Sequence, residues 1–170
     1  GDYSTQAMIH RMNSDLANDL GNLSQRVLSM VFKNCEGTMP AFPDQPTTED
    51  RVLVAAADTL LPAVREQMDR QAFHEALRLI WQVIADSNRY VDAAAPWALK
   101  KTDPGRMAEV LAVLAEIIRQ VAILVQPLMP ASAEKMLDQL GVAADQRSFA
   151  QIGGGTRLAH GQAIARPEPI

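Results

Sequence analysis

The chain has 170 residues, 48% of them hydrophobic and 5% aromatic, with a single cysteine and a formal net charge of −4. This composition is typical of one folded domain, excludes an intrinsically disordered chain, and leaves Cys35 without a partner for an internal disulfide or a multi-thiolate metal site. The acidic balance argues against a broad phosphate-binding surface, because such surfaces are rich in Lys and Arg. No apolar run is long enough to span a membrane, and a reducing cytoplasm is the expected compartment.

The first predicted element is a long helix. Apolar residues spaced alternately by three and four run from Ile9 to Met30 and indicate one buried stripe. Ser4 is suited to cap this helix at its N-terminus. Gly21 lies inside the stripe, where it costs about 1 kcal/mol relative to Ala, and this suggests close approach by a neighbouring helix. The helix is expected to end near Asn34, because glycine and prolines follow it.

Two more helices are predicted in the middle of the chain. A helix over residues 47–68 opens with Thr-Thr-Glu-Asp, in which hydroxyl caps are followed by acids in the first turn. Pro62 is expected to kink it or to be tolerated with local strain. The next helix covers residues 71–90. Pro96 disfavours helical geometry at the residue before it, so Trp97 is expected to begin a short new turn.

The last two helices have clear start and stop signals. Asp103 and Pro104 predict the start of a helix that continues to Pro127, with Asp as the cap and Pro at the first helical position. Apolar residues cover most of its circumference, so we expect it near the centre of a bundle. A final short helix over residues 131–140 is expected to end at Gly141, a typical glycine C-cap.

These elements predict an all-α fold. The chain is expected to form one domain over residues 1–170, with a five-helix bundle over about residues 4–143 and an irregular C-terminal tail over about residues 144–170. The three glycines at 153–155 resemble a phosphate loop only superficially, because no strand precedes them and no Gly-Lys-Ser/Thr follows. A flexible turn is expected there.

Catalytic and metal-binding patterns are mostly absent from the sequence. Cys35 has no neighbouring His or acid in the chain. His10, His74 and His160 are dispersed and form no His-x-x-x-His or Glu-x-x-His pair. We therefore predict no catalytic residue, no metal site and no cofactor in this chain.

One polar pattern is compatible with recognition of a ligand. Asn18, Asn22 and Arg26 are spaced by four residues and are expected to line one face of the first helix beside the buried stripe. An amide both donates and accepts, and a guanidinium donates with fixed geometry, which are the properties that base recognition requires. The spacing by itself fits a solvated helix face better.

Trp97 is the second candidate. It follows a proline at a helix break and precedes Lys100 and Lys101, whereas Trp81 falls on an apolar stripe and is expected in the core. An aromatic ring beside cations is suited to stack on an unpaired base. A tryptophan that closes the end of the bundle fits the same position equally well.

The residues around these candidates carry a family resemblance. Residues 13–26 resemble the first helix of the anticodon-binding domain of methionyl-tRNA synthetases, a class I family. Residues 88–92, followed by Ala-Pro-Trp at 95–97, resemble its second recognition segment. Further matches to its C-terminal portion are Pro-Leu-Met-Pro at 127–130, Leu-Gly at 140–141 and Pro-Glu-Pro-Ile at 167–170. The resemblance covers essentially the whole chain.

The resemblance implies roles for the candidate residues. Asn22 and Arg26 would hydrogen-bond the edge of the first anticodon base, the cytosine of CAU, and Trp97 would stack on a base splayed out of the loop. Three more positions match residues near the anticodon: Asn18, Asp92 and Pro96. Recognition of this kind rests on stacking and base-edge contacts and does not require a basic surface. Asn22, Arg26 and Trp97 are therefore expected to meet on one exposed surface.

The resemblance also implies what the chain lacks. The family's catalytic half carries two ATP-handling motifs, similar to His-Ile-Gly-His and Lys-Met-Ser-Lys-Ser, and many members carry the cysteines of a zinc-binding insertion. None of these occurs here, so the chain alone is expected to be non-catalytic. Its parent would ligate methionine to tRNA(Met) with ATP. The expected partners are the tRNA anticodon loop and the parent's own catalytic domain, and the start at Gly1 fits a piece of a longer protein.

Two alternatives stay open. The equivalent domain of another class I synthetase, such as the isoleucyl, valyl, leucyl or cysteinyl enzyme, shares the bundle but not the combined Asn-Leu-x-x-Arg and Ala-Pro-Trp segments. A helical protein–protein interaction module without an RNA ligand is favoured by the acidic charge. The set of Asn22, Arg26 and Trp97 argues against the module.

Overall fold

The computed structural model describes residues 2–170, and within them the fold is all-α, as predicted. The only β-pairing in this range is an isolated antiparallel bridge between Thr38 and Ala163. The helices are α1 (Asp2–Asn34), α2 (Thr48–Asp58), α3 (Leu60–Asp69), α4 (Phe73–Ala94), α5 (Pro96–Thr102), α6 (Pro104–Leu124) and α7 (Pro130–Leu140), followed by three short 3-10 helices. In the described part of the chain, no helix is both long and apolar enough to cross a membrane.

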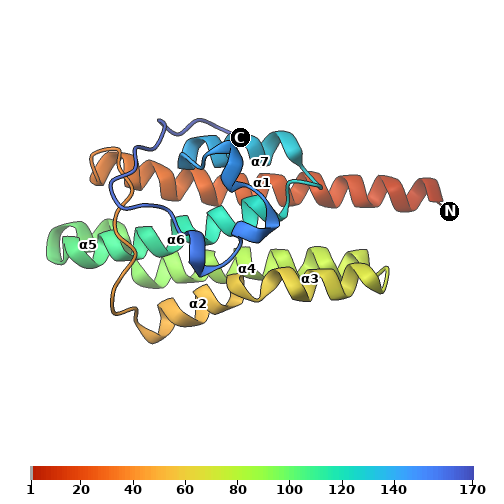
Figure 1. Cartoon of the computed structure of the whole chain (residues 1–170), viewed down its shortest axis with the longest axis horizontal. Helices are drawn as coiled ribbons and strands as arrows, with labels where there is room; N and C mark the ends of the chain where they lie inside the picture. Colours follow the sequence, from red (N-terminus) through yellow and green to blue (C-terminus); the bar gives the residue numbers. More distant parts are fainter. Residues whose placement is uncertain (1) are drawn as a thin grey trace.

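α6 is the central helix of the bundle, as its apolar circumference predicted. Every residue from Val110 to Val125 is buried, and α6 contacts α1, α2, α4, α5 and α7. Figure 1 shows α6 between α1 and α7 on one side and the α2, α3 and α4 layer on the other, while the N-terminal part of α1 projects beyond the rest. The core therefore surrounds one apolar helix.

Several helix boundaries follow the predicted capping signals. The side chain of Thr47 accepts from the Asp50 backbone N–H, and the Asp50 carboxylate accepts from the Thr47 N–H, which completes a capping box at the start of α2. The Asp103 carboxylate accepts from the Arg106 N–H at 3.1 Å and caps α6. Gly141 closes α7 in the left-handed conformation, with φ +75°. Local chemistry thus sets these ends.

Two boundaries differ from the prediction. α1 begins at Asp2, so Ser4 lies within its first turn and is not the cap, because no glycine or proline separates residues 2–4 from the helix. The predicted kink at Pro62 is a full break one turn earlier, at Thr59. Pro62 then falls in the first turn of α3, where a missing N–H removes no intrahelical hydrogen bond.

Gly21 allows a close approach, but not by a neighbouring helix. A Cβ built on Gly21 would lie 3.1 Å from the Cβ of Ile170, the last residue of the chain. The expected partner was wrong because the tail, and not a helix, folds back onto this part of α1. Gly21 thus leaves room for the end of the tail.

The tail of residues 144–170 is irregular in its secondary structure but extensively bonded to the bundle. The Met39 N–H donates to the Gln162 carbonyl at 2.7 Å, and the Ala165 N–H donates to the Gln139 carbonyl of α7 at 3.1 Å. Figure 1 shows this segment running across the bundle and returning to α7. The tail therefore closes one side of the core.

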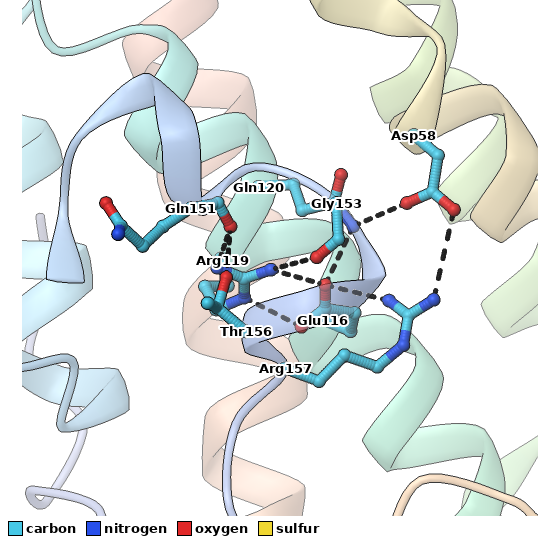
Figure 2. A network of polar contacts seen from close by, with 8 residues as sticks. All are labelled: Asp58, Glu116, Arg119, Gln120, Gln151, Gly153, Thr156 and Arg157. Carbon is cyan, nitrogen blue, oxygen red and sulfur yellow. Dashed lines mark hydrogen bonds and ion pairs between the residues drawn. The ribbon is translucent and has the colours of Figure 1, made fainter.

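A buried ion pair anchors the middle of the tail. Arg119 of α6 donates to both carboxylate oxygens of Glu116 at 2.7 Å, and its other N–H groups donate to the carbonyls of Gln151 and Gly153 at 2.7 and 2.9 Å. The Glu116 carboxylate also accepts from Arg157 of the tail at 2.9 Å. Figure 2 shows how these side chains link α6 to the tail and, through Asp58, to α2. The turn at residues 153–155, which was expected to be flexible, is thus held by the hydrogen bond from Arg119 to the Gly153 carbonyl.

Candidate nucleic-acid interface

Arg26 of α1 and Trp97 of α5 meet at the surface of the bundle. The Arg26 Cζ lies 5.3 Å from the centroid of the Trp97 ring, a distance typical of a cation–π contact. Trp97 keeps 50% of its surface exposed, so it does not plug the end of the bundle. The structure therefore brings these two predicted residues together on an accessible face.

The turn between α4 and α5 presents Trp97 to α1. Ala95 adopts the left-handed conformation, with φ 48° and ψ 61°, which ends α4 and redirects the chain. Pro96 is the first residue of α5 and is buried, so its ring fixes the start of the helix from which Trp97 projects. Pro96 therefore acts on this site through the position of Trp97.

Asp92, in the last turn of α4, holds the Arg26 side chain. The Arg26 Nη2 donates to the Asp92 Oδ1 at 2.9 Å across 66 positions of sequence. The two side chains are 41% and 67% exposed. An ion pair this exposed contributes only about 0–1 kcal/mol to stability, so a ligand can displace it at little energetic cost. The ion pair orients the Arg26 guanidinium and leaves it accessible to a ligand.

Asn22 and Arg26 line a surface cavity of about 350 Å³ between α1 and α4. Its lining residues are Asp19, Asn22, Leu23, Arg26, Trp81, Ile84, Ala85 and Asn88. Trp97 is not among them and is joined to the cavity through Arg26. Arg26 thus links the cavity that Asn22 also lines to the half-exposed indole of Trp97.

The structure does not bring Asn18 to this cavity, although Asn18 is exposed on α1. The face of α1 turned toward α4 follows residues 19, 22 and 26, spaced by three and four, and not 18, 22 and 26. A spacing of four and four drifts about 40° around a helix per step, because four residues exceed one turn of 3.6. The cavity therefore includes Asp19 in place of Asn18.

Sequence reasoning missed Asp19 and the polar contact of Trp81. Trp81 was expected in the core. It is partly buried and packs against the core, and its indole Nε1 donates to the Asp19 Oδ2 at 2.7 Å. The sequence contained one signal for Asp19, because it stands three residues before Asn22 and seven before Arg26. The hydrogen bond to Trp81 spans 62 positions and has no local signature.

A second polar cluster fixes the end of α4 that carries Asp92. The Asp50 carboxylate of α2 is buried, accepts two hydrogen bonds from Arg106 of α6 at 2.9 and 2.8 Å, and accepts one from the Tyr90 hydroxyl at 2.5 Å. Burial and the hydrogen bond to the Asp50 carboxylate raise the pKa of Tyr90, which therefore keeps its proton and acts as a donor. The cluster joins α2, α4 and α6 through Asp50, Tyr90 and Arg106.

The cysteine and the three histidines, for which no functional role was predicted, do not line this cavity. Cys35 is partly buried, and burial raises the pKa of its thiol. His10, His74 and His160 are exposed. Among residues 2–170, no group of three or more His, Cys, Asp or Glu side chains is placed to hold a metal ion.

Known proteins are similar to this chain in sequence and in fold. A family profile described as the anticodon binding domain of methionyl tRNA ligase matches residues 40–170. The chain is 49% identical over 170 residues to the methionine–tRNA ligase of Rhizobium meliloti (strain 1021), covering all of this chain and 33% of that protein. It is 47% identical over 174 residues to the methionine–tRNA ligase of Mycobacterium tuberculosis (strain H37Rv), with the same coverage.

The crystal structure of the apo form of Mycobacterium tuberculosis methionyl-tRNA synthetase is similar with a TM-score of 0.86 and 45% identity, over 96% of this chain and 33% of that one. A crystal structure of the same synthetase bound by methionyl-adenylate gives the same TM-score. The chain spans about a third of the length of the curated relatives it matches. It belongs to the family of anticodon-binding domains of methionyl-tRNA ligases.

Proposed function

We propose that this domain reads the CAU anticodon of tRNA(Met) on the surface formed by Asn22, Arg26 and Trp97. The observation that carries the proposal is the Arg26–Trp97 pair, with the Arg26 Cζ 5.3 Å from the ring centroid, beside a surface cavity that Asn22 also lines. Unpaired loop bases are recognised by stacking on aromatic rings and by hydrogen bonds to their Watson–Crick edges. The half-exposed indole of Trp97 is suited to stacking, and the amide of Asn22 and the guanidinium of Arg26 are suited to hydrogen bonding with a base edge.

The acidic net charge is compatible with this function. The proposed surface relies on base contacts, and only a few phosphates need to be neutralised there. Lys100 and Lys101, exposed in the last turn of α5, follow Trp97 closely and are available for that purpose. Because the salt dependence of binding grows with the number of phosphates contacted, we expect a shallow dependence.

We infer that the full-length protein is a methionine–tRNA ligase that uses ATP, because the chain matches about a third of each ligase and one of them was solved with methionyl-adenylate. The domain would then work beside the catalytic part of the same protein, in the cytoplasm. ATP, and the zinc of many relatives, would belong to that part, and no residue of this chain is assigned to either.

Arg26→Ala and Trp97→Ala in the full-length ligase are each expected to lower kcat/KM for tRNA(Met) by roughly 10- to 100-fold. Losing one base-edge contact or one stacked base costs about 1–3 kcal/mol. Formation of methionyl-adenylate, measured by ATP–pyrophosphate exchange, is expected to stay unchanged, because neither residue takes part in it.

Arg78→Ala is the matched control, since Arg78 is an exposed, ion-paired arginine of α4 that does not line the cavity. Its charging kinetics should equal those of the wild type. The rival function, a protein interaction module without RNA, requires that charging of tRNA(Met) be unaffected by Arg26→Ala and Trp97→Ala. That result would refute the proposal.

A further inference from the structure

The cavity beside Arg26 contains a carboxylate with a fixed orientation. Asp19 of α1 accepts a hydrogen bond from the Trp81 Nε1 through its Oδ2, at 2.7 Å. Within residues 2–170 no other hydrogen bond or ion pair to the Asp19 carboxylate is observed, and Asp19 is exposed and lines the cavity. Its second oxygen is therefore available to a ligand as an acceptor.

We propose that Asp19 determines specificity for cytosine by accepting a hydrogen bond from the exocyclic amino group of that base, and that Trp81 is the residue that positions it. This inference rests on the proposed function, which places the first anticodon base at this cavity. Neither residue was identified from the sequence as part of the site.

The side chains along α1 are complementary to the edge of cytosine. Residues 19, 22 and 26 present an acceptor, a group that both donates and accepts, and a donor, in that order. The Watson–Crick edge of cytosine presents its N4 amino donor followed by the N3 and O2 acceptors. Carboxylates are suited to accept from the N4 amino group. In donor and acceptor type, the carboxylate and the guanidinium thus complement the two ends of the cytosine edge.

The same arrangement opposes uracil. Uracil carries a carbonyl oxygen, O4, where cytosine carries the amino group, so the Asp19 carboxylate would face a second acceptor. Leu23 and Ile84 are buried and form apolar parts of the cavity wall. A base bound against this wall would exclude water from the contact, which strengthens both attraction and repulsion. Asp19 therefore favours cytosine and disfavours uracil through one contact.

Trp81 makes this contact depend on the charge of Asp19. A carboxylate has two acceptor oxygens, so it can accept from Trp81 and from the base at the same time. In Asp19→Asn the single amide oxygen is expected to stay with the Trp81 N–H, which turns the amide NH₂ toward the base. That NH₂ is a donor, so it opposes the cytosine amino group, which is also a donor, and it can donate to the uracil O4.

The test measures kcat/KM of the full-length ligase for three tRNA(Met) transcripts that differ only in the first anticodon base: cytosine, uracil, and 2-pyrimidinone, which is cytosine without its amino group. In the wild type, loss of the amino group is expected to lower kcat/KM roughly 10- to 100-fold, as for a hydrogen bond to a charged group. Asp19→Asn should abolish this difference and lower the cytosine-to-uracil preference by at least tenfold.

Trp81→Phe provides a second, independent measurement. The phenyl ring removes the N–H donor, so in the double variant Trp81→Phe/Asp19→Asn the amide is free to turn its oxygen toward the base. The double variant should recover part of the cytosine preference that Asp19→Asn lost. A merely structural role of Asp19 predicts no such recovery.

Asp15→Asn, one turn earlier on α1 and away from the cavity, is the matched control and should behave as the wild type. If the wild type prefers cytosine but Asp19→Asn leaves both ratios unchanged, the inference about Asp19 is overturned and the proposed function stands. If the wild type itself charges all three transcripts equally, the proposed function fails as well. Adenylate formation verifies that the catalytic part of each variant is intact, and circular dichroism of the chain with each substitution verifies that this domain is folded.

Discussion

The Glu116→Ala variant is expected to lose about 3–5 kcal/mol of its free energy of unfolding, the largest effect of any single substitution considered. Glu116 and Arg119 are 2% and 1% exposed, and the carboxylate is the only counter-charge in contact with Arg119 among the described residues. Without it, the guanidinium would remain buried with only the carbonyls of Gln151 and Gly153 as acceptors. An unpaired buried charge is far more unfavourable than a broken surface pair.

Urea denaturation of the chain, followed by circular dichroism, measures this loss. Glu134→Ala removes an exposed carboxylate of α7 and should change the free energy of unfolding by no more than about 0.5 kcal/mol. Limited proteolysis adds a local readout, because Arg119 holds the tail: residues 149–157 should be cut faster in Glu116→Ala. Equal unfolding free energies for the two variants would show that the buried pair does not stabilise the fold.

Acid pH is expected to remove about 2 kcal/mol of stability through Asp50 alone. Burial by itself raises the pKa of the Asp50 carboxyl, but hydrogen bonds from Arg106, Tyr90 and the Thr47 N–H outweigh burial and lower the pKa from 3.8 to about 2. The folded chain thus binds this proton less readily than the unfolded chain. The contribution is fully present above about pH 5 and is lost as the pH falls through 3.8 toward 2.

The measurement compares wild type with Asp50→Asn. At pH 6 the variant should be less stable by at least about 2 kcal/mol, because the Arg106 guanidinium and the Tyr90 hydroxyl lose their charged acceptor. Between pH 5 and pH 2 the two stability curves should converge by about 2 kcal/mol. Asp145→Asn, at an exposed position, should follow the wild type. Parallel curves for wild type and Asp50→Asn over this range would contradict the assignment.

The helices were predictable from the sequence because their signals are local. The Thr47–Asp50 capping box, the Asp103-Pro104 start and the Gly141 stop each depend on residues within one turn of each other. The short turn at Trp97 follows from the restriction that Pro96 places on the residue before it. The exceptions are the start at Asp2, which is a shift of two residues, and the break at Thr59, which divides one predicted helix into α2 and α3.

The candidate site was predictable only in part. The four-residue spacing identified Asn22 and Arg26 as neighbours, but it ranked Asn18 with them, and only packing against α4 shows that Asp19 faces the cavity. The family resemblance supplied the expectation that Trp97 joins them. Their roles in anticodon recognition stay predictions that the kinetic experiments decide.

The sequence by itself determined the all-α class, the positions of the helices, the central place of α6 and the residues from which an interface could be built. The tertiary structure alone decided which distant groups meet: Trp81 with Asp19, Ile170 with Gly21, and the tail carbonyls with Arg119. The physical reason is that capping and helical periodicity act over a few residues. Contacts across many positions depend on how whole helices and the tail pack around one apolar core.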